Sequence, residues 1–203
     1  MNGSAGDEGE AQVREMALLG TAVLLAQKFE FALYGITACL AHLPEAQQEK
    51  RFRDLKPEAF LRGDPSDFKA TLGQLAGRFG KPLLLASNEL DQLVADRNLI
   101  AHNYWRTFHA NIGGAGGRQD AGPFLTRFIA LADHLLKVVS GLLTRLRIEA
   151  AVKEGREGEI TLSEDDLVNM LLHLGHVHRQ LMFTHQPDGS VTVRPLVDDG
   201  SAG

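Results

Sequence analysis

The stretch "DRNLIAHNYW", residues 96–105, places an arginine, an asparagine, a histidine and a tyrosine at the end of an apolar helical pattern. Histidine transfers protons near neutral pH, and the planar guanidinium of arginine donates paired hydrogen bonds to phosphate. Cleaving RNA through its own 2′-hydroxyl requires a base, an acid and positive charge on the phosphate. Arg97, Asn98, His102 and Tyr104 are therefore candidates for an RNA-cleaving site that uses neither a metal nor a cofactor.

The spacing of these residues limits how they can meet. Asn98 and His102 are four residues apart and share one face of a helix. Arg97 and His102 are five apart, which separates them by roughly 140° around an ideal helix. They converge only if the helix loosens before His102, or if a second copy of the chain completes the site. We favour the second arrangement, because a two-fold homodimer brings the same stretch of both chains face to face.

The sequence "RNLIAH" followed by "NYW" resembles the Arg-x4-His signature of the HEPN superfamily of helical bundles. The residue after the arginine is often polar in that family, and Asn98 matches this. Tyr104, two residues after the histidine, matches the toxin-like branch. The resemblance covers roughly residues 13–150. It implies a metal-independent endoribonuclease with a composite site across a homodimer, in a toxin–antitoxin or phage-defence setting.

The same resemblance implies further residues and partners. A nucleotidyltransferase-type antitoxin would modify the motif tyrosine, which is Tyr104 here. An acidic residue on the first helix often accompanies the motif, and Glu30 is the candidate. RNA would be the substrate.

Each of these residues also has a structural interpretation. Arg97 could form a surface ion pair with Asp96 or Glu89, and His102 could end the helix where the helix dipole favours a cation. Tyr104 and Trp105 could be packing aromatics. In that case the chain would be a non-catalytic regulatory or adaptor module that binds a protein or a nucleotide.

The elements that must position the motif are predicted to be helices. Apolar periodicity favours helices over about 13–43, 64–80 and 83–102 and a long one from Pro123 with core positions to Leu146, which predicts an all-α bundle of four to five helices over residues 13–155. The family resemblance implies that this bundle is HEPN-like. Residues 156–197 are expected to form an appendage. In it, Ser163 and Asp166 cap a short helix that ends at Gly175, and a β-hairpin surrounds "QPDG". Residues 1–12 and 198–203 are expected to be disordered tails.

Composition excludes several classes of protein. At 44% hydrophobic residues the chain can bury a core, and its net charge of −5 argues against non-specific coating of nucleic acid. A single cysteine, Cys39, allows no intrachain disulfide and suits a cytoplasmic protein. The most apolar stretch is interrupted by Lys28 and Glu30, so we expect a buried helix and no membrane span.

A second polar cluster lies near the C-terminus, where "HLGHVH" contains three histidines and His185 follows. His176 and His178 would share one face of a strand. A metal site requires three or four converging ligands. Because no cysteine or suitably spaced carboxylate accompanies them, we expect solvated or packing histidines and no metal site.

Overall fold

The computed structural model describes residues 4–40, 84–85, 87–110, 120–186 and 189–195. The helix predicted over 64–80 and most of the glycine-rich segment after His109 lie outside the described residues. The described part of the chain is mostly helical, as predicted. Its elements are α1 (Ser4–Leu40), α6 (Asn88–His102), α7 (Tyr104–Phe108), α8 (Gly122–Lys153), the 3₁₀ turn η1 (Glu157–Glu159), α9 (Glu164–Arg179), β1 (Leu181–His185) and β2 (Val191–Pro195).

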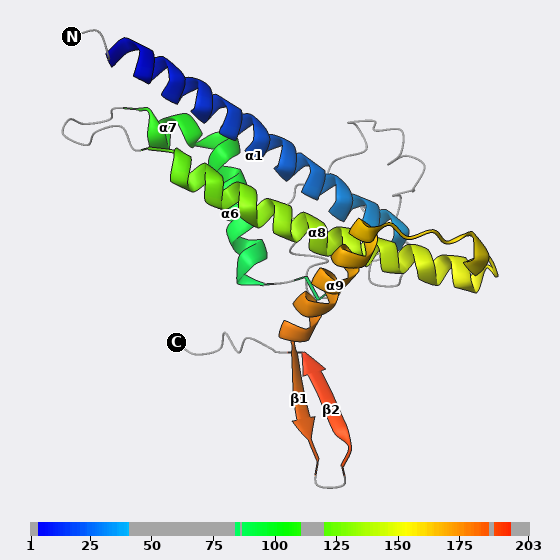
Figure 1. Ribbon diagram of the computed structural model, residues 1–203. Helices are drawn as coiled ribbons and strands as arrows, with labels where there is room; N and C mark the ends of the chain where they lie inside the picture. Colours follow the sequence, from blue (N-terminus) through cyan, green and yellow to red (C-terminus); the bar gives the residue numbers. More distant parts are fainter. Residues whose placement is uncertain (1–3, 41–83, 86, 111–119, 187–188, 196–203) are drawn as a thin grey trace.

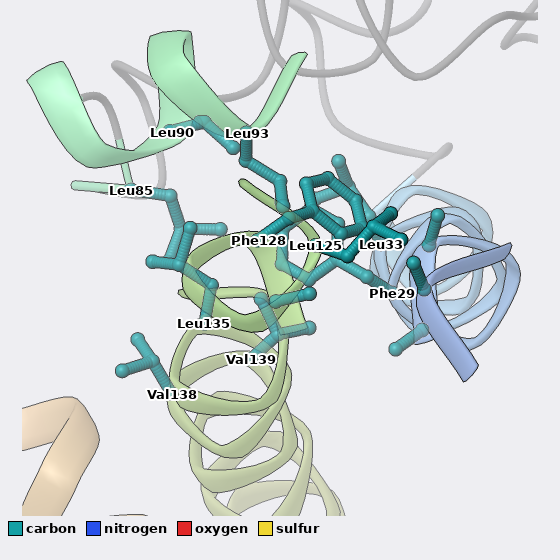
Figure 2. Close-up of a cluster of buried hydrophobic side chains, with 14 of the residues drawn as sticks. Phe29, Leu33, Leu85, Leu90, Leu93, Leu125, Phe128, Leu135, Val138 and Val139 are labelled. Carbon is teal, nitrogen blue, oxygen red and sulfur yellow. The ribbon is translucent and has the colours of Figure 1, made fainter. Parts of the chain in front are cut away.

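The two longest helices, α1 and α8, lie side by side and run in the same direction (Figure 1). The short helix α6 crosses them, and α9 crosses α8 farther along the chain. Figure 2 shows that the core lies where α1, α6 and α8 meet. Its largest fully buried side chains include Phe29, Leu33, Leu93, Leu125 and Phe128. Burying each such side chain contributes about 1.5–3 kcal/mol, so this contact sets the arrangement of the three helices.

The N-terminal helix is longer than the sequence pattern indicates. It begins at Ser4, so residues 4–12, which were predicted to be a disordered tail, are helical. Glu8 lies near the start of this segment and favours a helix, because an acidic side chain complements the positive end of the helix dipole. By length and composition, α1 could also cross a membrane over Glu8–Ile36. Only 22% of its most apolar window is buried, so this helix is less buried than the sequence predicts.

The helix that carries the motif starts later than predicted. It begins at Asn88 instead of about Leu83, and the Ser87 hydroxyl accepts a hydrogen bond from the Leu90 amide at its N-terminus. Leu84 has a φ of 55°, a left-handed conformation that an α-helix does not accommodate. The end of α6 at His102 agrees with the prediction.

The appended helix α9 packs directly on α8. Ser163 and Asp166 form the predicted capping box. The Asp166 carboxylate also accepts a hydrogen bond from the buried Thr144 hydroxyl of α8 at 2.8 Å. These hydrogen bonds, those from Ser163 first, lower the pKa of Asp166 to about 2. At the crossing, a Cβ on Gly141 would lie 2.1 Å from the Asn169 carbonyl oxygen, so only glycine permits this close approach.

The prediction that α9 ends at Gly175 is wrong, since the helix continues to Arg179. His176 and His178 therefore lie on a helix and not on a strand, and they do not share a face. His176 is buried with His173 against α8, whereas His178 is exposed and stacks on Phe183 at a ring distance of 5.1 Å. The helix continues through Gly175 because the packing of the two buried histidines offsets the roughly 1 kcal/mol that a glycine costs inside a helix.

The predicted hairpin is present. Strands β1 and β2 pair antiparallel with Phe183 opposite Val193, and Gly189 has a φ of 81° in the connection. The hairpin extends away from the helices, beyond the end of α9 (Figure 1).

Replacing Gly141 by alanine should separate α9 from α8. The added methyl group meets a backbone carbonyl oxygen that cannot move without moving α9, and we expect a loss of about 1–3 kcal/mol in the free energy of unfolding. Urea unfolding measures it, with Gly158→Ala as the control, because a Cβ there meets no atom. Equal stability of the Gly141→Ala variant and the unmodified chain would contradict the observed crossing.

His173 should make stability depend on pH. Burial, followed by the charges of Arg145 and His176, lowers the pKa of His173 from 6.5 to about 4. Between these values the unfolded chain binds more protons than the folded one, so stability decreases as the pH falls below 6.5. From pH 7 to pH 5 we expect His173 to account for a loss of roughly 1–2 kcal/mol.

The measurement is urea unfolding at both pH values on the unmodified chain and on His173→Leu. The window lies above the range in which Asp166 titrates. The leucine variant should lose less stability on acidification, and identical losses in both chains would disprove the role of His173.

Candidate functional site

The motif residues lie where α6 passes into α7. Helix α6 remains helical through His102, and the Asn103 amide donates to the Leu99 carbonyl at 2.8 Å. Asn103 has φ −130° and ψ 3°, which interrupts the helix before α7 begins at Tyr104. The chain therefore changes direction between His102 and Tyr104, and the two side chains enter different environments.

Asn98 and His102 share a face of α6, as their spacing predicts. Both are exposed, and both line an open pocket of about 580 Å³. The other residues along this pocket are Ala95, Leu99, Asn103 and Thr107. The pocket therefore presents an imidazole and amide side chains but no arginine or lysine from the described residues.

Arg97 faces α1 instead of the pocket. Its Nη2 lies 3.5 Å from the Glu30 Oε2, and its Nη1 donates to the Asn98 Oδ1 at 3.3 Å. The carboxylate partners suggested by the sequence alone, Asp96 and Glu89, are not the ones found. Glu30, expected only from the family resemblance, is brought to the motif. The long ion pair is partly exposed and contributes at most about 1 kcal/mol, so Arg97 can leave it at little cost.

Helix α6 is unbroken between Arg97 and His102, so the first of the two ways for them to converge does not occur. Arg97 and His102 keep the separation of roughly 140° expected on an ideal helix, so their side chains lie on different sides of α6. Arg97 is linked to the pocket only indirectly, through its hydrogen bond to Asn98. Within the described chain, Asn98 and His102 come together and Arg97 stays apart.

Tyr104 is buried, away from the pocket. Its hydroxyl donates to the Glu15 Oε1 at 2.7 Å, and the His109 Nε2 lies 2.5 Å from the same oxygen. A modifying enzyme would reach this hydroxyl only after it leaves Glu15. The sequence gives no indication of Glu15 or His109, because their pairing joins residues far apart in the chain.

Asp96, the residue before Arg97, is also buried. Its Oδ1 accepts a hydrogen bond from the Gln92 Nε2 at 2.8 Å. Its Oδ2 has no hydrogen-bond partner within the part of the chain that the structure describes. Asp96 therefore lies on the buried face of α6, whereas Asn98 and His102 lie on its exposed face.

The histidine cluster does not converge. Burial lowers the pKa of both His173 and His176. His178 points to the hairpin. Over residues 4–40, 84–110 and 120–195, apart from the gaps given above, no three His, Cys, Asp or Glu side chains are placed to hold a metal ion.

Comparison with known proteins gives limited information. No protein-family model matches the chain, and no solved structure matches it. The chain is 36% identical over 138 residues to an alanine–tRNA ligase of Herpetosiphon aurantiacus. The match covers 68% of this chain but only 14% of the ligase, so it relates the chain to a segment of that protein.

Replacing Tyr104 by phenylalanine should lower the free energy of unfolding by about 1 kcal/mol, because it removes the hydrogen bond to Glu15 and keeps the ring packing against Phe108. Urea unfolding measures the change. Phe183→Leu on the exposed hairpin serves as a control for a conservative change of an aromatic residue. An unchanged Tyr104→Phe stability would mean that Glu15 does not anchor α7.

Proposed function

We propose that the chain is a metal-independent endoribonuclease of the HEPN type, with the described helices forming part of the expected four-to-five-helix bundle. The observation that carries the proposal is the placement of Asn98 and His102 on the wall of one open pocket. RNA cleavage there would proceed by attack of the 2′-hydroxyl on the adjacent phosphate, which forms a 2′,3′-cyclic phosphate and breaks the bond to the 5′-oxygen of the next nucleotide. His102 takes the proton from the 2′-hydroxyl and gives it to the departing 5′-oxygen, and Asn98 orients either the imidazole or the phosphate.

Arg97 supplies the positive charge on the phosphate, and it does so from a second copy of the chain. Within one chain, Glu30 holds the Arg97 guanidinium on another side of α6. No arginine or lysine is among the described residues that line the pocket. A partner's Arg97 would complete the pocket, since the long and partly exposed ion pair to Glu30 releases it easily. The site is thus composite, and the functional unit is a homodimer.

The outer face of α1 supports association of two copies. Val13, Met16 and Leu24 are exposed on it, at 71%, 62% and 52%. Their separations of three and eight residues place them on one side of the helix. Exposed apolar stripes of this kind mark interaction surfaces. The same helix carries Glu30, the carboxylate partner of Arg97.

Transfer RNA is the first substrate to test. The alanine–tRNA ligase that shares a segment with this chain is named for its action on tRNA, which makes tRNA the natural first choice. We place the enzyme in a toxin–antitoxin or phage-defence setting in the cytoplasm. A nucleotidyltransferase-type antitoxin that modifies Tyr104 would first have to displace its hydroxyl from Glu15.

Purified protein should cleave RNA in excess chelator, and His102→Ala should reduce the rate by at least about 100-fold, the usual effect of removing a general acid or base. Asn98→Ala should show a smaller loss. His185→Ala is the matched control, because this histidine is exposed on the hairpin. Cleavage of tRNA, ribosomal and messenger RNA is followed on gels. Cleavage that survives His102→Ala, or that chelator abolishes, would overturn the mechanism.

A non-catalytic adaptor is the second candidate, and one observation favours it. The outer face of α9 and one face of the hairpin expose apolar side chains, among them Leu167, Leu171, Leu174, Phe183 and Val193. A protein partner could cover this surface. Absence of cleavage by the unmodified chain on every RNA tested would favour this function.

A further inference from the structure

Trp105 is held in an unusual environment for a tryptophan. It is 71% exposed, and one face of its indole stacks on the His109 ring with centroids 4.7 Å apart and planes 23° apart. The opposite face of the indole is open to solvent. A tryptophan that stabilised the fold by burial would not be placed this way, because most of its apolar surface remains in water.

The stacked pair is fixed from behind. The His109 Nε2 contacts the Glu15 Oε1 at 2.5 Å, and Tyr104 donates to the same oxygen. The side chain of His109 is only 11% exposed, so the indole rests on a ring that is itself anchored to α1. A preformed flat surface loses little conformational entropy when a planar ligand stacks on it.

The surroundings of Trp105 are polar. Asn103, Arg106 and Thr107 are exposed beside it in the sequence, and Arg14 is exposed next to Glu15 on α1. An exposed aromatic ring combined with arginines is the composition of single-stranded nucleic-acid sites, where bases stack on the ring and cations contact the backbone.

The site is also close to the pocket. Asn103 and Thr107 flank Trp105 in the sequence and line the pocket with His102. We propose that the open face of Trp105 stacks on an unpaired nucleobase of single-stranded RNA whose neighbouring phosphate enters this pocket. The proposal deepens the nuclease function and rests on it for the identity of the ligand, but it concerns binding and not cleavage.

Trp105 is the single tryptophan of the chain, so intrinsic tryptophan fluorescence reports on this position alone. The full-length His102→Ala protein, which is expected not to cleave, is titrated with a short single-stranded oligoribonucleotide. An oligonucleotide of equal length with the same backbone but without bases is the matched ligand. We expect quenching by the first and little by the second. Equal quenching by both would overturn the proposal, because the backbone alone would then explain it.

Variants separate stacking from folding. Adding Trp105→Ala to the His102→Ala protein should weaken binding of the base-bearing oligonucleotide about 10-fold, measured by anisotropy of a labelled RNA, and Trp105→Phe should recover part of it. Thermal unfolding of both variants should match that of the parent, since the indole is mostly exposed. Unchanged affinity in Trp105→Ala overturns the proposal.

Two other outcomes are informative. Fluorescence that changes with protein concentration but not with RNA would identify Trp105 as a contact between copies of the chain and would overturn base stacking. Quenching by bases in a chain that never cleaves RNA would refute the nuclease function and retain the stacking site. Cleavage without base-dependent quenching would retain the nuclease function and refute the stacking site.

Discussion

The arrangement of the described chain depends on α8, because α1 and α6 bury apolar side chains against this helix and α9 packs on it with the buried His173 and His176. Its core positions Leu125 and Phe128 receive α1 and α6, as Figure 2 shows, whereas Gly141 allows α9 to cross at contact distance. Leu90 and Leu93 fix the first half of α6 in the core. The second half of α6, with Asn98 and His102, remains at the surface, where an open pocket can form.

Two carboxylates of α1 then determine what the motif residues can do. Glu15 holds Tyr104 and His109 in short, largely buried contacts, and this fixes α7 and the stacked Trp105. Glu30 holds Arg97 in a long, partly exposed ion pair that is weak enough to exchange. The same helix therefore keeps one part of the motif rigid and leaves the arginine available to another chain.

The sequence predicted those features that depend on local pattern. Apolar periodicity predicted α8 and the C-terminal end of α6, the Ser163–Asp166 pair predicted the cap of α9, and turn residues predicted the hairpin. Helix spacing also predicted correctly that Asn98 and His102 share a face. Features that depend on tertiary packing were missed: α9 continues through Gly175 because its histidines pack on α8. The contacts of Glu15 could not be foreseen, because no local pattern connects it to Tyr104.

Mixing two inactive variants tests the proposal that Arg97 and His102 act from different copies of the chain. Arg97→Ala and His102→Ala are each purified, then combined so that subunits exchange, and RNA cleavage is measured in chelator. A composite site predicts that the mixture regains activity, because one site of the mixed dimer keeps an intact Arg97 from one chain and an intact His102 from the other. A mixture as inactive as its two components would contradict the claim.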